Sequence, residues 1–207
     1  MSGYSQAVAA TSSDAPSNLN IANALTVLRL VAVPGFVFAL LFDGGENATS
    51  RLVAAIIFFV AIITDAFDGH LARRYDLVTD FGKLADPIAD KALIGAALIG
   101  LSFLGSPPLA VELPWWMTIV ILGRELGITA MRFAVKKYGV MPAGRGGKAK
   151  TVVQTAAIGL YLLPLVEGTE MFILGVMYFA VAITVVTGLD YVVDAIRLRR
   201  SSLATSV

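Results

Sequence analysis

Long apolar runs alternate with short polar connections along the chain. Six runs reach or approach the roughly 20 residues that a helix needs to cross the hydrocarbon core of a bilayer. The fifth run is short, and the last is long enough to project beyond the bilayer. The runs lie at residues 22–42, 52–70, 84–105, 114–135, 151–166 and 169–196. This pattern predicts an all-α integral membrane protein with six transmembrane helices.

The connections indicate one membrane domain between two tails. Glycine and proline mark the clearest breaks, at Pro107–Pro108 and Gly139–Gly147. Residues 1–20 are small and polar and hold no Lys or Arg, so they lack the basic region of a secretory signal. We expect a flexible cytoplasmic tail at 1–20, a six-helix membrane domain at 21–198 and a C-terminal tail at 199–207.

Basic residues are concentrated in every second connection. The base-rich connections are 71–83, 136–150 and the C-terminal tail, and the base-poor ones are 43–51, 106–113 and 167–170. Connections rich in Lys and Arg stay on the cytoplasmic side of a membrane. Both termini are therefore expected to face the cytoplasm, in a multi-pass protein of the cell membrane.

Composition agrees with lipid as the main solvent and excludes several chemistries. Hydrophobic residues make up 57% of the 207 residues and charged residues 15%, whereas soluble domains are roughly a quarter charged. Without cysteine, the chain has no disulfide, thiol nucleophile or Cys-ligated zinc. His70 is the one histidine, so multi-histidine metal sites are excluded. The net charge of +1 gives no indication of a nucleic-acid partner.

Two pairs of aspartates flank the connection between the second and third runs. Asp65 and Asp68 are three residues apart, and Asp86 and Asp90 are four apart, so each pair shares one helix face. Four carboxylates brought together by a tight connection repel one another unless cations lie between them. Oxygen-only ligands suit Mg²⁺ or Mn²⁺, and two such ions can clamp a pyrophosphate. One acidic pair at a helix end is usually just solvated, but two pairs with glycine and arginine between them favour a metal site.

The complete pattern resembles the signature of the CDP-alcohol phosphatidyltransferase family. All eight of its fixed positions are present, in the order Asp65-x2-Asp68-Gly69-x2-Ala72-Arg73-x8-Gly82-x3-Asp86-x3-Asp90. The resemblance implies the CDP-alcohol phosphotransferase fold, a homodimer and two divalent ions, Mg²⁺ or Mn²⁺, in each active site. It also implies that Asp65 and Asp86 bridge the ions, that Asp68 and Asp90 each complete one site, and that Asp90 is the general base.

Residues for the nucleotide-lipid substrate follow from the same resemblance. Gly69, Arg73 and Thr79 match positions that contact the cytidine diphosphate group, and Thr26 and Arg29 are assigned to CDP-diacylglycerol binding with them. Arg29 also has a simpler interpretation, because long cationic side chains often extend to the headgroup level of the membrane.

Three further stretches are similar to the phosphatidylglycerophosphate synthase branch of the family. They are Asn23–Arg29, Arg124–Arg132 and Gly147–Thr151, which extend the resemblance to about residues 18–165. Glu125, Thr129 and Arg132 share a face of the fourth run, where Glu125 could hold an arginine that meets an anion. The predicted ligands of the acceptor phosphate are Arg124, Arg132, Lys148 and Lys150, although the two lysines could equally be cytoplasmic anchors.

The predicted activity is an enzymatic transfer within the membrane domain, at an active site facing the cytoplasm. A phosphatidyl group would pass from CDP-diacylglycerol to sn-glycerol 3-phosphate, giving phosphatidylglycerol phosphate and CMP. Two alternatives remain open at this point. A sibling enzyme would use another acceptor, such as inositol phosphate, serine or phosphatidylglycerol. A cation transporter would instead use the carboxylates as a transport site.

Overall fold

Six α-helices and one short 3₁₀ helix make up the described part of the chain in a computed structural model. The structure describes residues 21–74, 80–105, 111–135, 145–165 and 168–205, without the side chains at 21–23, 68–74, 80–87, 90, 145 and 200–205. The elements are α1 (Ile21–Leu41), η1 (Phe42–Gly45), α2 (Ala48–Arg74), α3 (Asp80–Leu104), α4 (Trp115–Val135), α5 (Arg145–Leu162) and α6 (Glu170–Thr205).

Each predicted apolar run is found as a helix, so the all-α prediction is confirmed for the described residues. The largest differences are at the ends. α5 begins at Arg145, six residues before the predicted run, inside a glycine-rich stretch that the sequence marks as a break. α6 extends to Thr205, well past the predicted end at residue 196.

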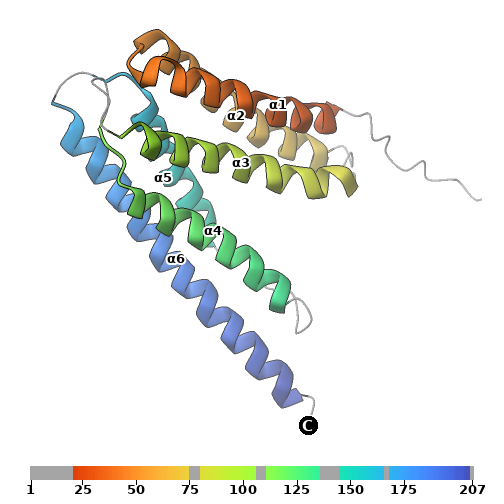
Figure 1. Ribbon diagram of the computed structural model, residues 1–207. Coiled ribbons are helices and arrows are strands. Elements are labelled where there is room, and N and C mark those ends of the chain that lie inside the picture. Colours follow the sequence, from red (N-terminus) through yellow and green to blue (C-terminus); the bar gives the residue numbers. More distant parts are fainter. Residues whose placement is uncertain (1–20, 75–79, 106–110, 136–144, 166–167, 206–207) are drawn as a thin grey trace, which may run out of the picture.

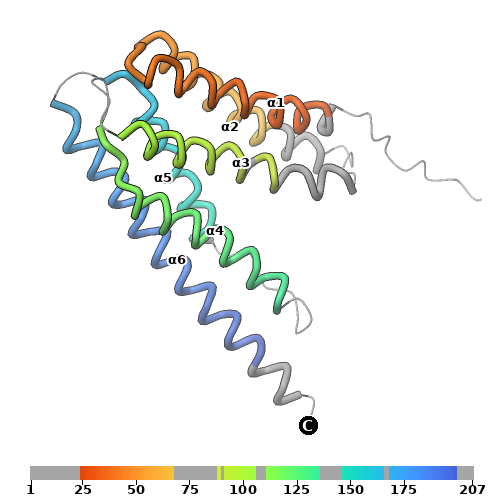
Figure 2. The backbone as a smooth tube through the Cα atoms, viewed as in Figure 1, coloured from red at the N-terminus to blue at the C-terminus, as the bar shows by residue number. Residues whose placement is uncertain are grey.

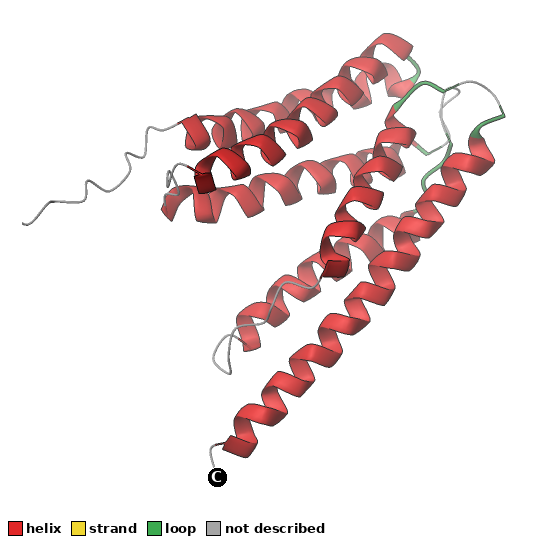
Figure 3. Cartoon of the chain, turned by 180° about the vertical axis from the view of Figure 1, so that it is seen from behind, coloured by secondary structure: helices red, strands yellow, loops and turns green. Residues whose placement is uncertain are grey.

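The helices form two groups that share one end of the molecule. α1 packs against α2 and α3, whereas α6 packs against α4 and α5. Contacts of α5 with α2 and α3, and of α3 with α4, join the groups. Figures 1 and 3 show the groups close together at the end where α1 and α3 finish and α4 and α6 begin, which we call the closed end. They diverge toward the opposite end, where α4 and α6 finish and α5 begins, which we call the divergent end.

Apolar side chains fill the closed end and hold the groups together. The Phe36 and Phe58 rings, from α1 and α2, lie 6.1 Å apart and are fully buried. The same cluster includes Leu98 of α3, Ile121 of α4 and Ile158 of α5. A core shared by all six α-helices anchors the closed end, and the tube in Figure 2 can be followed as the two helix groups diverge from it.

Arg51 is an exception in this apolar core. Its side chain is 0% exposed, and Nη2 donates a hydrogen bond of 2.5 Å to the backbone oxygen of Tyr161. That oxygen lies in the last turn of α5, where helix carbonyls have no partner within the helix and carry partial negative charge. Arg51 therefore caps α5 from the first turn of α2 and ties the two helix groups together.

Three helices are long and apolar enough to be candidate membrane spans among the described residues. They are Ala24–Gly45, Ala48–Phe67 and Glu170–Arg199. α4 and α5 are long enough, but each carries three charged residues, and the described apolar stretch of α3 is the shorter Lys91–Leu104. Three of the six predicted membrane crossings are thus found as candidate spans. The charged residues of α4 and α5 must have a role other than facing lipid.

We predict that Gly159→Ala destabilises the contact between α2 and α5. A Cβ at Gly159 would overlap the Phe59 ring, and overpacking of this kind costs about 1–3 kcal/mol. Thermal unfolding in detergent, followed by tryptophan fluorescence, should show a lower midpoint. Gly175→Ala in α6 is the matched control, because no atom lies within 4 Å of the added carbon. An unchanged midpoint for Gly159→Ala would contradict the packing described.

Candidate functional site

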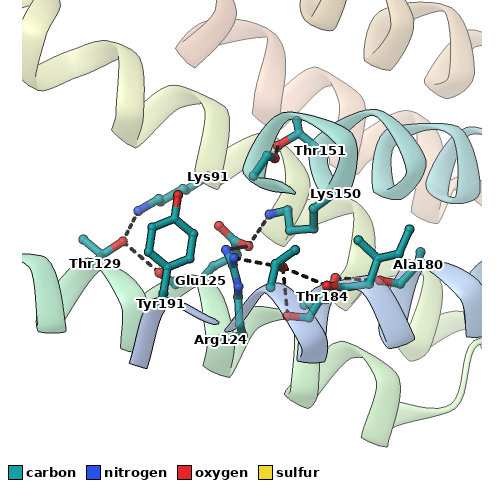
Figure 4. A network of polar contacts seen from close by, with 12 residues as sticks. Lys91, Arg124, Glu125, Thr129, Lys150, Thr151, Ala180, Thr184 and Tyr191 are labelled. Carbon is teal, nitrogen blue, oxygen red and sulfur yellow. Dashed lines mark hydrogen bonds and ion pairs between the residues drawn. The ribbon is translucent and has the colours of Figure 1, made fainter. Parts of the chain in front are cut away.

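A cavity of about 740 Å³ opens between α3, α4, α5 and α6. Its polar lining residues are mostly basic, and a smaller number of apolar residues complete the wall. The lining consists of Lys91, Arg124, Glu125, Ile128, Thr129, Arg132, Gly147, Lys148, Lys150, Thr151, Val152 and Tyr191. Figure 4 shows side chains from all four helices converging on Glu125.

Glu125 pairs with two of the cations through one carboxylate oxygen. Oε1 accepts a hydrogen bond of 3.1 Å from Arg124 Nη1 and a short one from Lys150 Nζ. The three side chains are 20%, 12% and 7% exposed for Glu125, Arg124 and Lys150. Removal of a lone charge from water is costly unless it is paired. Glu125 thus allows two cations from different helices to lie side by side beneath the cavity surface.

A second polar link joins α3 to α4. Lys91 donates a short hydrogen bond to the Thr129 hydroxyl, which itself donates to the backbone oxygen of Glu125 at 2.7 Å. Lys91 lies one residue after Asp90 on α3. The basic cavity therefore extends to the residue that follows the last predicted aspartate in the sequence.

α6 supplies the remaining wall and contacts both arginines of α4. Arg124 Nη2 donates to Thr187 Oγ1 at 3.1 Å, and Arg132 Nη2 donates to the Tyr191 hydroxyl at 3.0 Å. Thr187 and Tyr191 are four residues apart and so face the same side of α6. The last helix of the chain thus contributes directly to the lining and the support of the cavity.

The charge balance of the cavity favours an anion. Five cationic side chains line it against one carboxylate, and that carboxylate is already paired with two of them. Low-dielectric walls strengthen the attraction between such cations and a ligand. Two guanidinium groups add the planar donor geometry that fits the oxygens of a phosphate.

All four residues predicted to bind the acceptor phosphate line this one cavity. They come from α4 (Arg124 and Arg132) and from the first turns of α5 (Lys148 and Lys150). Lys150 is buried and paired, which does not fit the alternative of a surface anchor, whereas Lys148 is exposed. The expectation that Glu125 holds an arginine is also met, by its neighbour Arg124.

The predicted metal and nucleotide residues are described only in part. Asp65 forms an ion pair with Arg29, whose Nη1 lies 2.6 Å from Asp65 Oδ1. Arg29 is 2% exposed, so it does not extend to a surface, whereas Asp65 remains 43% exposed. Thr26 is buried one turn before Arg29 on α1. The side chains of Asp68, Gly69, Arg73, Asp86 and Asp90, and the whole of Thr79, lie outside the described residues.

Sequence reasoning missed Lys91, Thr187 and Tyr191. Lys91 directly follows the last aspartate of the signature, and its charge inside an apolar run was the available signal. On α6, Thr184, Thr187 and Tyr191 recur at spacings of three and four, which places hydroxyl groups on one face. Neither signal identifies the partner helix, so contacts to α4 were not predictable from them.

A smaller pocket of about 250 Å³ adjoins the cavity on the side of the apolar core. The two share Lys91, Glu125, Lys150 and Thr151. Beyond these residues the pocket wall becomes mostly apolar, with Ile94, Leu122 and Leu126 beside Gln154 and Thr155. The basic cavity thus grades into an apolar recess between α3, α4 and α5.

Comparisons with known proteins agree with this geometry. A family model described as CDP-alcohol phosphatidyltransferase matches residues 19–187. A Mycobacterium tuberculosis protein named probable phosphatidylglycerophosphate synthase is 54% identical over 178 residues, which cover 86% of this chain and 82% of the relative. Proteins named CDP-diacylglycerol–glycerol-3-phosphate 3-phosphatidyltransferase are similar as well. The one from Bacillus subtilis is 36% identical over 83% of this chain and 93% of its own length, and the one from Haemophilus influenzae is 32% identical over 83% and 91%.

The match covers most of the chain, including α1 to α5 and the first half of α6, and the relatives are matched over most of their own lengths. This extent excludes a resemblance limited to one short motif, and it argues against the alternative of a cation transporter. The chain belongs to the CDP-alcohol phosphatidyltransferase family.

Proposed function

We propose that the protein transfers a phosphatidyl group from CDP-diacylglycerol to sn-glycerol 3-phosphate, forming phosphatidylglycerol phosphate and CMP. The observation that carries this proposal is the basic cavity beside the middle of α3, with Lys91, Arg124, Arg132 and Lys148 on its wall. An acceptor that is a phosphate monoester suits this charge, whereas serine would bring no phosphate to neutralise it. The names of the similar proteins point to the same acceptor.

The phosphate of the acceptor would lie between the two helices that carry the cations. Arg124 and Arg132 approach from α4, and Lys148 approaches from the first turn of α5. Unpaired N–H groups at this helix start add further donors and a positive dipole end. Charge-assisted hydrogen bonds of this kind are about twice as strong as neutral ones. They would hold the glycerol end toward α3.

The residues present fit a divalent metal, which the family uses. Carboxylate oxygens are the ligands that Mg²⁺ and Mn²⁺ prefer, and Asp65 retains enough exposure to meet a cation while Arg29 holds its Oδ1. We propose Asp65, Asp68, Asp86 and Asp90 as the ligands of two ions, with Gly69, Arg73, Thr79, Thr26 and Arg29 around the nucleotide. When bound, the ions would neutralise the pyrophosphate of the donor.

The proposed chemistry is an in-line displacement at the β-phosphorus of the donor. Asp90 takes the proton from the sn-1 hydroxyl of the acceptor as that oxygen forms its bond to phosphorus. The bond from phosphorus to the bridging oxygen breaks, and CMP leaves with the electron pair. Lys91 lines the cavity and directly follows Asp90 on α3. The proposed base is therefore the neighbour in sequence of a residue that would face the acceptor phosphate.

The orientation of the protein in the membrane follows from where the donor must enter the cavity. The donor's acyl chains would remain in the bilayer while its nucleotide enters from the divergent end of the fold. We propose that this end faces the cytoplasm, where CTP-derived donors and phosphorylated alcohols are available, in the inner cell membrane. A homodimer is proposed from the family resemblance alone.

Purified protein in detergent should release CMP from CDP-diacylglycerol only when glycerol 3-phosphate is added. EDTA should abolish the release, and excess Mg²⁺ or Mn²⁺ should restore it, because the carboxylate ligands cannot neutralise the pyrophosphate by themselves. Parallel reactions offer serine, inositol phosphate or phosphatidylglycerol as the acceptor. CMP release with one of these acceptors and not with glycerol 3-phosphate would overturn the proposed acceptor.

Asp65→Asn and Asp86→Asn should each lower the rate of CMP release at least about 100-fold, the scale of loss when one transition-state electrostatic contact is removed. Each substitution would disturb both ions, because these two residues are the proposed bridging ligands. Asp194→Asn is the control, since Asp194 is an exposed aspartate on α6 outside the cavity. Substantial turnover by either variant, with unfolding midpoints like that of the parent, would contradict the bridging assignment.

A further inference from the structure

We infer that Tyr191 is a positioning residue that sets the geometry of the two arginines, and with it the preference for phosphate-bearing acceptors. This inference rests on the proposed function. Tyr191 lies four residues beyond the segment matched by the family model. Its role therefore comes from the contacts of this structure.

The Tyr191 ring lies beside both guanidinium groups of α4. The central carbon of Arg124 is 5.4 Å from the ring centroid, and that of Arg132 is 5.0 Å away. Both distances lie within the range of cation–π attraction, about 6 Å. In addition, Arg132 Nη2 donates a hydrogen bond of 3.0 Å to the Tyr191 hydroxyl. One aromatic side chain thus contacts two like charges that would otherwise repel each other.

The two arginines depend on this ring to different degrees. Arg124 is 12% exposed and also bonds to Glu125 and Thr187. Arg132 is exposed, and Tyr191 provides it with both a hydrogen bond and a ring contact. An exposed arginine has many accessible rotamers, and holding it in one of them costs conformational entropy. Tyr191 therefore matters most for the order of Arg132.

Tyr191 is itself held firmly by its neighbours. The residue is 7% exposed, and the backbone of α5 passes close to it, since a Cβ at Gly147 would lie 3.3 Å from the Tyr191 hydroxyl. One turn earlier on α6, a Cβ at Gly188 would lie 3.1 Å from Arg124 Cγ. Glycine at both positions allows α4, α5 and α6 to approach closely around the ring. The position of the ring is thus fixed, and its contacts restrict the positions of both guanidinium groups.

Two ordered guanidinium groups select for a dianionic phosphate monoester. Each can form paired hydrogen bonds to phosphate oxygens, and prior ordering reduces the entropy lost when the ligand binds. An acceptor without a phosphate gains nothing from this arrangement. The ring consequently affects binding of the acceptor and leaves binding of the nucleotide-lipid donor unchanged.

The test compares Tyr191→Phe and Tyr191→Leu with the parent protein. Phe keeps the ring but loses the hydrogen bond to Arg132, and should raise the KM for glycerol 3-phosphate about 3–10-fold. Leu loses both interactions, and the rise should exceed about tenfold. The KM for CDP-diacylglycerol and the kcat at saturating acceptor should change by less than about twofold. Inhibition by inorganic phosphate should weaken in proportion to the rise in KM.

Tyr178→Leu is the matched control, because Tyr178 is an exposed tyrosine that lies on the same helix and does not line the cavity. Its ring contacts that of Trp116, with the ring centroids 5.8 Å apart. It should leave both KM values unchanged. If Tyr191→Leu does not fold, Tyr191→Phe alone decides the question. An unchanged KM for glycerol 3-phosphate in Tyr191→Phe, or a fall in kcat without a change in KM, would overturn the inference. Failure of the parent protein to use glycerol 3-phosphate at all would instead overturn the proposed function.

Discussion

The paired carboxylate of Glu125 is the interaction on which the site depends. It lies between Arg124 and Lys150, with all three side chains largely out of water. Loss of one partner from a buried pair typically costs about 3–5 kcal/mol, because the remaining charge is left uncompensated. With Glu125 in place, a cation from α4 and a cation from α5 can lie together at a depth where neither would be stable alone. The positive charge of the cavity is thus built on a triad in which one carboxylate compensates one of two cations.

Two other helices are arranged around that triad. Lys91 brings α3 into contact through Thr129, while Thr187 and Tyr191 bring in α6 through the arginines. The helix groups are meanwhile fixed to each other at the closed end, by the apolar cluster and by the Arg51 contact to Tyr161. The molecule thus combines a tightly packed apolar end with a polar cavity that widens toward the divergent end. Rigid packing at one end positions ligands from four helices at the other.

The sequence was sufficient for the helices and for part of the site. Apolar runs of about 20 residues located all six helices, and the similarity of two stretches to the phosphatidylglycerophosphate synthase branch identified Arg124, Arg132, Lys148 and Lys150. Periodicity describes one helix at a time, however, so it did not predict contacts between residues 59 and 63 positions apart, such as Arg132 with Tyr191 and Arg124 with Thr187. It also placed the start of α5 too late, because glycines that weaken an isolated helix here permit close packing on α6.

The shared carboxylate also has a consequence for biogenesis. An ionised residue at the centre of a helix costs about 2.5–3.5 kcal/mol on the scale of translocon-mediated insertion, so α4 and α5 are poor substrates for entering the lipid one at a time. Together they present Glu125 and Lys150 as a neutral pair. In the folded protein the described residues of α4 and α5 pack mainly on α6 and not on each other. Pairing of Glu125 with Lys150 therefore depends on the long apolar α6, which enters the lipid readily and brings the two helices together.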